Sequence, residues 1–225
     1  MGRFEPKAIE RKSANTNNYY TWLIDSDPAW SEFPKRSKSL ICSSFESYTF
    51  GFGDVIYRVI PFNDAKIGVA SKSDFWISFK KGLKDIYGEI DLDDFNSILE
   101  DLHYIITCEE ESFGYPKTSE EFFYKLNSMF AALNEMSDEE LKDKMKNANI
   151  IMNIKTIRKV KSIEDLYSLL NPDKNDIELY DYNEYKRKDI EYNEVWTDSK
   201  SLLVNVIIAD KIELNYKLGK YLYTF

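Results

Sequence analysis

FPKRSKSLICSS, at residues 33–44, and YRVIP, at residues 57–61, are the two stretches of this 225-residue chain that decide its fold. Both contain short runs of apolar residues with high strand propensity, so we expect a strand in each. A basic cluster stands before the first strand and two hydroxyl groups stand at its end. These two predicted strands therefore carry polar and charged side chains at or near their ends.

Further strands are predicted on both sides of a central region. Apolar and β-branched runs bounded by turn residues mark them. The predicted strands before this region are Tyr19–Ile24, Ser39–Ser43, Val55–Pro61 and Lys66–Ala70, and those after it are Ile177–Tyr182, Glu194–Thr197, Leu202–Ile208 and Lys211–Tyr216.

The sequence of the central region, residues 73–147, predicts helices. Apolar residues recur there at helical spacing after Ser73, Asp91, Thr118 and Ser137, each of which suits a helix start. Thr118 with Glu121, and Ser137 with Glu140, also match the capping-box pattern. A further short helix is predicted after Ser162.

Charge is distributed unevenly along the chain. The whole sequence has 30 Lys and Arg against 39 Asp and Glu, and residues 76–145 alone carry 7 basic and 17 acidic side chains. The pattern predicts an α+β fold in which two β-rich segments form a mixed or antiparallel sheet, with an acidic helical block between them. The predicted divisions are a flexible segment (1–18), a first β-rich half (19–72), the helical block (73–147) and a second β-rich half (148–225).

The composition excludes several classes of protein. Hydrophobic residues make up 43% of the chain, too many for a disordered protein. No apolar run reaches the roughly 20 residues of a membrane helix, and no export leader opens the sequence. Cys42 and Cys108, with the single His103, make a poor metal-ligand set, so no metal site is predicted. We expect a cytoplasmic protein that does not enter membranes.

The first candidate site lies at the ends of the early strands. Arg36 and Arg58 supply positive charge there, and Ser43 and Ser44 supply hydroxyl groups. Such groups together suit an anionic ligand such as a pyrophosphate. The alternative is a solvated loop and an edge strand.

The second candidate site is EYNEVWT, residues 191–197. Tyr192 and Trp196 bracket a glutamate at the head of a strand, where aromatic groups could hold a flat ring and the carboxylate could stabilise developing positive charge. The alternative is an ordinary exposed glutamate beside aromatic side chains that belong to the core.

The order of these features resembles the mono-ADP-ribosyltransferase fold, in particular its small, divergent versions from phages and toxin systems. Ser39–Ser44 resembles the family's hydroxyl-ended strand, and residues 191–194 resemble its late glutamate motif. The chain departs from the family in two respects. The predicted strand Tyr19–Ile24 carries no arginine, and Glu191 and Glu194 are one residue further apart than the usual pair.

The resemblance implies an enzyme that cleaves the nicotinamide glycosidic bond of NAD and transfers ADP-ribose to a protein or nucleic-acid acceptor. It implies Glu194 and Glu191 as catalytic residues, with Glu194 stabilising the oxocarbenium-like charge. The NAD-binding residues that it implies are Arg36 or Arg58 on the pyrophosphate, Ser43 or Ser44 near the ribose, and Tyr48 or Trp196 stacked on the nicotinamide.

A second hypothesis needs no catalysis. The carboxylates of residues 76–145 could form a helical face that engages a basic partner surface. The protein would then be an acidic binding or inhibitor protein. Stabilisation of the chain by NAD favours the enzyme, and its absence together with tight partner binding favours the binding protein.

Overall fold

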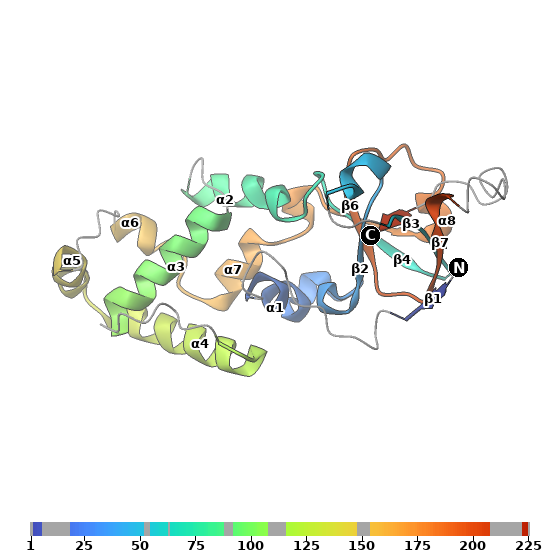
Figure 1. Cartoon of the computed structure of the whole chain (residues 1–225). Helices are drawn as coiled ribbons and strands as arrows, with labels where there is room; N and C mark the ends of the chain where they lie inside the picture. Colours follow the sequence, from blue (N-terminus) through green and yellow to red (C-terminus); the bar gives the residue numbers. More distant parts are fainter. Residues whose placement is uncertain are drawn as a thin grey trace.

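The computed structural model describes residues 2–5, 19–51, 55–62, 64–87, 92–107, 116–147, 154–207 and 222–224. A β-sheet occupies one end of the molecule and a body of helices occupies the other (Figure 1). The α+β class predicted from the sequence is confirmed.

The strands form one eight-stranded sheet in the order β1-β7-β3-β8-β2-β6-β4-β5, and every described pair is antiparallel. Strands from the beginning and the end of the chain alternate in it, so the two β-rich segments build one unit. The strands are β1 (Gly2–Phe4), β2 (Leu40–Ser43), β3 (Tyr57–Pro61), β4 (Lys66–Val69), β5 (Glu178–Asp181), β6 (Glu194–Thr197), β7 (Ser201–Asn205) and β8 (Leu222–Thr224).

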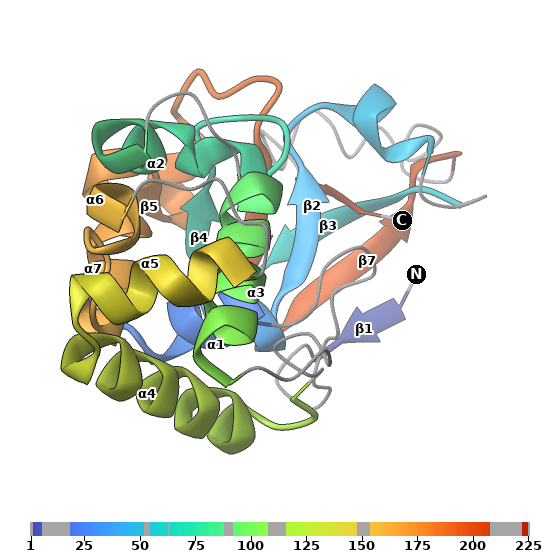
Figure 2. The same ribbon diagram turned by 90° about the vertical axis from the view of Figure 1, so that its left-hand side faces the viewer.

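The helical body is larger than the predicted block. Helices from the flanking segments join those of residues 73–147 and pack beside them (Figure 2). The α-helices are α1 (Tyr19–Ser26), α2 (Lys80–Tyr87), α3 (Leu92–Thr107), α4 (Ser119–Glu135), α5 (Asp138–Asn147), α6 (Ile154–Ile157), α7 (Ile163–Leu169) and α8 (Tyr182–Tyr185).

The structure bears differently on two predictions at the ends of the chain. The segment 1–18 was expected to be flexible, but Gly2–Phe4 pairs with β7 as an edge strand. Residues 1 and 6–18 lie outside the described residues, as does the strand predicted at Lys211–Tyr216.

The strand predicted at Tyr19–Ile24 is wrong, because these residues begin helix α1. Tyr19, Tyr20, Leu23 and Ile24 are all buried, and their spacing of one and four residues places them on one helical face. Tyr19 stacks on Phe122 of α4, with ring centroids 5.1 Å apart. Packing on another helix therefore overrides the strand propensity of these aromatic and branched residues.

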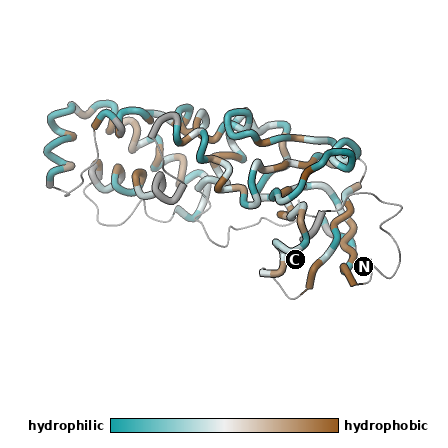
Figure 3. Tube along the Cα trace, turned by 90° about the horizontal axis from the view of Figure 1, so that it is seen from above, coloured by the Kyte–Doolittle hydropathy of each residue, from teal (hydrophilic) through white to brown (hydrophobic). Residues whose placement is uncertain are grey.

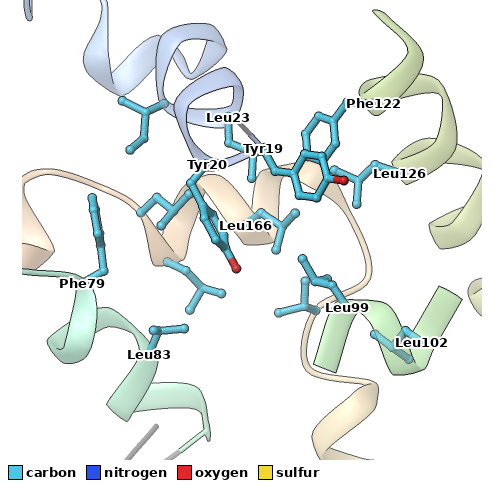
Figure 4. Packing of buried hydrophobic residues seen from close by; sticks show 14 of the residues in the cluster. Tyr19, Tyr20, Leu23, Phe79, Leu83, Leu99, Leu102, Phe122, Leu126 and Leu166 are labelled. Atoms are coloured by element: carbon cyan, nitrogen blue, oxygen red, sulfur yellow. The ribbon is translucent and has the colours of Figure 1, made fainter. Parts of the chain in front are cut away.

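The core of the helical body joins distant parts of the sequence. Side chains from α1, α2, α3, α4 and α7 meet there (Figure 4). Trp196 of the sheet belongs to this cluster too, so the core continues onto one face of the sheet. Along the helices, hydrophobic and hydrophilic residues alternate, as expected for helices with one buried face (Figure 3). A second cluster covers the other face of the sheet, around Val59, Ile67 and Val195.

Three of the predicted helix starts, at Thr118, Ser137 and Ser162, are confirmed by hydrogen bonds. The helix predicted after Ser73 begins instead with a 3-10 helix at Trp76–Phe79, and Asp91 lies outside the described residues. The Ser137 hydroxyl accepts from the Glu140 N–H at 3.2 Å, and the Glu140 carboxylate accepts from the Ser137 N–H at 2.9 Å. Thr118 caps α4 and Ser162 caps α7 in the same way through their hydroxyl oxygens. These bonds satisfy backbone donors that a helix start leaves open.

Gly68 of β4 allows the sheet to carry a tryptophan. It lies opposite Trp196 of β6, and a Cβ added to Gly68 would stand 2.2 Å from the indole ring. Both residues are buried. The ring cannot move away, since its indole N–H donates to the Pro34 carbonyl at 3.0 Å.

We therefore expect Gly68→Ala to lower the free energy of unfolding by about 1–3 kcal/mol, the usual cost of overpacking. Denaturant titration would measure the loss. Gly51→Ala is the matched control, because a Cβ there meets nothing within 4 Å. Equal stability of Gly68→Ala and wild type would show that the Trp196 ring can shift to accommodate the added methyl group.

The buried Asp27 makes the stability of the fold depend on pH. Its carboxylate is buried, one oxygen accepts from the Ala29 N–H at 2.9 Å, and the other has no hydrogen-bond partner among the described residues. Burial raises the pKa of Asp27, although the Ala29 hydrogen bond and the charge of Lys35 oppose the shift. The native state thus keeps this proton to a higher pH than the unfolded chain, so its contribution to stability falls as the pH rises through the native pKa.

Asp27→Asn keeps the acceptor for Ala29 and removes the titration. We expect the stability of the wild type relative to Asp27→Asn to decline as the pH rises from roughly 3 to 7. Urea unfolding of both proteins across this range would measure it. Parallel curves would contradict a buried, titrating Asp27.

Candidate functional site

Three of the predicted site residues lie in one row across the sheet. Ser43 of β2 faces Glu194 of β6 on one side and Tyr223 of β8 on the other, and Tyr223 in turn faces Arg58 of β3. Directly opposed residues point to the same face of a sheet. At about 4.8 Å per strand, the backbones of Arg58 and Glu194 are about 14 Å apart. The row therefore spans the length of a small extended ligand.

Glu194 also meets Arg36, which lies in a 3-10 helix (Arg36–Lys38) before β2. The Arg36 Nη1 and Glu194 Oε1 atoms are 2.7 Å apart, and their side chains are 3% and 15% exposed. Neither atom has a regular hydrogen bond to any described residue, so the contact is an ion pair. The other carboxylate oxygen, Oε2, accepts from the Phe75 N–H at 3.2 Å.

Aromatic rings enclose the Arg36 guanidinium. Its central carbon lies 4.0 Å from the centre of the Phe75 ring and 5.0 Å from that of Trp196. Both distances suit cation–π attraction, which is stronger away from water. Arg36 is therefore held by Glu194 and by rings of the core.

The backbone around Arg36 is fixed by a helix end. The Asp25 carboxylate of α1 accepts from the Arg36 N–H at 2.7 Å and from the Ser37 N–H at 3.0 Å. Lys35 also donates to the Asp25 carbonyl. Helix α1 thereby positions the arginine that meets β6.

Three chain segments converge where β6 begins. The Glu194 N–H donates to the Lys72 carbonyl and the Ala70 N–H donates to the Glu194 carbonyl, each at 2.9 Å. The Asn193 side-chain amide donates to the Ala70 carbonyl at 2.7 Å, and its backbone N–H donates to the Ser44 hydroxyl at 2.9 Å. Ser44 is thus committed to the turn before β6, which it helps to shape.

Tyr192 adopts a left-handed backbone conformation, with φ of 64°. This is unusual for a bulky residue other than glycine, and it persists only where neighbouring contacts enforce it. The bonds of Asn193 provide such contacts. The Tyr192 ring packs on that of Phe45, with centroids 4.4 Å apart, and Tyr48 contacts both at near-perpendicular angles.

The structure corrects two of the predicted roles. Trp196 is completely buried, which leaves no ring face for a nicotinamide. Arg36 is buried and engaged with Glu194, so it cannot also lie on a pyrophosphate in this arrangement. Glu191 is exposed and stands before the left-handed turn, outside the row that holds Glu194.

The remaining predicted residues differ in how open they are to solvent. Arg58 and Ser43 share the row with Glu194 but are buried, so a ligand would reach them only after neighbouring side chains move, and the Ser43 hydroxyl accepts from the Phe45 N–H at 3.0 Å. Tyr48 is well exposed. Sequence reasoning missed Asn193, Asp25 and Phe75, whose roles depend on contacts between segments more than ten residues apart.

The described residues contain no group of three metal-ligating side chains, and none of their helices is long and apolar enough to cross a membrane. Comparison of the chain with protein-family models, with curated proteins and with solved structures finds no match. The site must therefore be interpreted from its own geometry. It offers a carboxylate fixed on two sides, a serine beside it and an arginine further along the same face.

Proposed function

We propose that this protein is an NAD-dependent mono-ADP-ribosyltransferase of the phage or toxin type, with Glu194 as its catalytic residue. The observation that supports this proposal is the row of Arg58, Ser43 and Glu194 on one face of the sheet. An arginine, a serine and a glutamate are the residue types that the family resemblance implies for NAD. Here they come from three different strands.

Glu194 would act on the charge that develops in the reaction. The bond between the ribose C1′ and the nicotinamide nitrogen breaks, and nicotinamide leaves with the bonding electron pair. The sugar becomes oxocarbenium-like, and a lone pair of the acceptor then bonds to C1′ as the acceptor loses a proton. A fixed carboxylate stabilises such a transition state because it needs no reorientation.

Arg36 and Phe75 together hold the Glu194 carboxylate in place. The Arg36 guanidinium and the Phe75 N–H hold the two carboxylate oxygens of Glu194, so Arg36 becomes a positioning residue. Arg58 is then the arginine proposed for the pyrophosphate. Ser43 is the hydroxyl proposed for the ribose, and Tyr48 is the exposed ring proposed for the nicotinamide.

The proposal also includes the acceptor, the substrate and the compartment of the reaction. The acceptor is a protein or a nucleic acid, and water is the acceptor in simple hydrolysis. NAD is a substrate. We place the protein in the cytoplasm, whose reducing conditions suit a chain with few cysteines and a buried Cys42.

A second candidate function is non-catalytic binding of a basic partner through the acidic helices. Exposed carboxylates of α4 and α5, including Glu120, Glu121 and Glu139, support it. Helix α5 lies at the end of the molecule away from the sheet, and α4 runs from that end toward α1 (Figure 1). A partner bound there would leave the row on the sheet free.

Incubation with NAD labelled in the nicotinamide ring tests the enzyme directly, with released nicotinamide as the readout. We expect the wild type to release nicotinamide and Glu194→Gln to do so about 100- to 1000-fold more slowly, the usual cost of removing such an electrostatic partner. Glu139→Gln, an exposed change on α5, is the control and should match the wild type.

Circular dichroism must show that Glu194→Gln is folded at the assay temperature, because the substitution also disturbs the contact with Arg36. Equal release by folded Glu194→Gln and wild type would remove Glu194 from the mechanism. Absence of both release and NAD-induced thermal stabilisation in the wild type would favour the binding protein.

A further inference from the structure

We propose that Phe45, Tyr48 and Tyr192, here named the aromatic platform, dock an arginine-bearing segment of a partner protein. The platform stands beside the strand ends of β2 and β6. The platform shares Tyr48 with the proposed nicotinamide site, but arginine binding requires no NAD, so it can be tested whether or not the protein is an enzyme.

The platform is exposed although its rings pack together. The three side chains are between 37% and 49% exposed, and the ring centroids are 4.4 to 6.2 Å apart. The contacts hold each ring in place while part of it meets solvent. Rigid aromatic residues of this kind give binding area at a low cost in conformational entropy.

The backbone at Tyr192 indicates that the position serves more than packing. A tyrosine at φ of 64° is strained, whereas glycine would adopt the same turn freely. The turn itself is enforced by Asn193, which donates to Ser44 and to Ala70. The fold therefore presents an aromatic ring at a place where its backbone would favour a residue without a side chain.

The charges beside the platform select the kind of partner. Glu46 lies between Phe45 and Tyr48 in the chain, and Glu191 directly precedes Tyr192. Neither carboxylate is buried. Phosphates of nucleic acid or of a lipid surface would be repelled here, whereas a guanidinium can stack on the ring faces and pair with a carboxylate.

Arginine is favoured over lysine for a physical reason. The planar, weakly hydrated guanidinium stacks on aromatic rings, while the ammonium group of lysine keeps its water more strongly. The protein already shows the same chemistry internally, since Arg36 stacks against Phe75 and Trp196. An external arginine would repeat that contact on the surface.

The test uses the full chain and two capped pentapeptides, one with two arginines and one with two lysines among glycines. NMR titration would measure their affinities for the wild type. We expect dissociation constants on the order of 1 mM or below for the arginine peptide and binding roughly fivefold weaker for the lysine peptide.

Two substitutions at Tyr192 separate the ring from the fold. Tyr192→Gly suits the left-handed turn and removes the ring, so it should weaken arginine-peptide binding at least fivefold. Tyr192→Phe keeps the ring and should bind within about twofold of wild type. Tyr124→Ala, which removes an exposed tyrosine of α4, is the control and should bind normally.

The acidic helices provide the competing explanation. If Glu120→Gln with Glu121→Gln abolishes binding and Tyr192→Gly does not, the peptide binds the helical body and the proposal is wrong. Equal affinity for the arginine and lysine peptides, or preferential binding of a single-stranded DNA oligonucleotide, would also overturn it. None of these results depends on whether NAD is cleaved, so this proposal and the enzyme proposal can fail separately.

Discussion

The buried ion pair between Arg36 and Glu194 is the contact on which the rest of the structure depends. It joins a short helix before β2 to the first residue of β6, and the rings of Phe75 and Trp196 enclose it. Removing two charges from water costs several kcal/mol, which close pairing must offset. The aromatic faces and the Phe75 N–H provide further attraction. The pair thereby joins the helical body to the sheet next to Trp196, which belongs to the same core.

Because of this ion pair, one position of the Glu194 carboxylate serves both the structure and the proposed reaction. The carboxylate completes the interface between helices and sheet, and Glu194 pairs with Ser43 in the register of β2 and β6. A carboxylate that is already oriented by the fold costs nothing to orient in a reaction. The same rigidity explains why the adjoining turn can keep Tyr192 in a strained conformation.

The parts of the fold that sequence predicted are those set by local patterns. The caps at Ser137 and Thr118 lie within three residues of their partners, and the β2 and β6 strands have clear apolar runs. Helix α1 was missed because Tyr19 and Ile24 suit a strand until Phe122 packs on them. Glu194 and Ser43 were found from their strand ends, whereas the burial of Trp196 depends on Gly68 and Pro34, which no local pattern connects to it.

The most direct test of this account is a double-mutant cycle on the free energy of unfolding. Arg36→Met, Glu194→Gln and the double variant would be compared with the wild type by denaturant titration. Each single variant leaves the partner group buried and without its counter-charge, so we predict losses of about 3–5 kcal/mol and a coupling energy of at least about 2 kcal/mol. Additive losses, with a coupling energy below about 0.5 kcal/mol, would show that the two side chains stabilise the fold independently and would contradict the account.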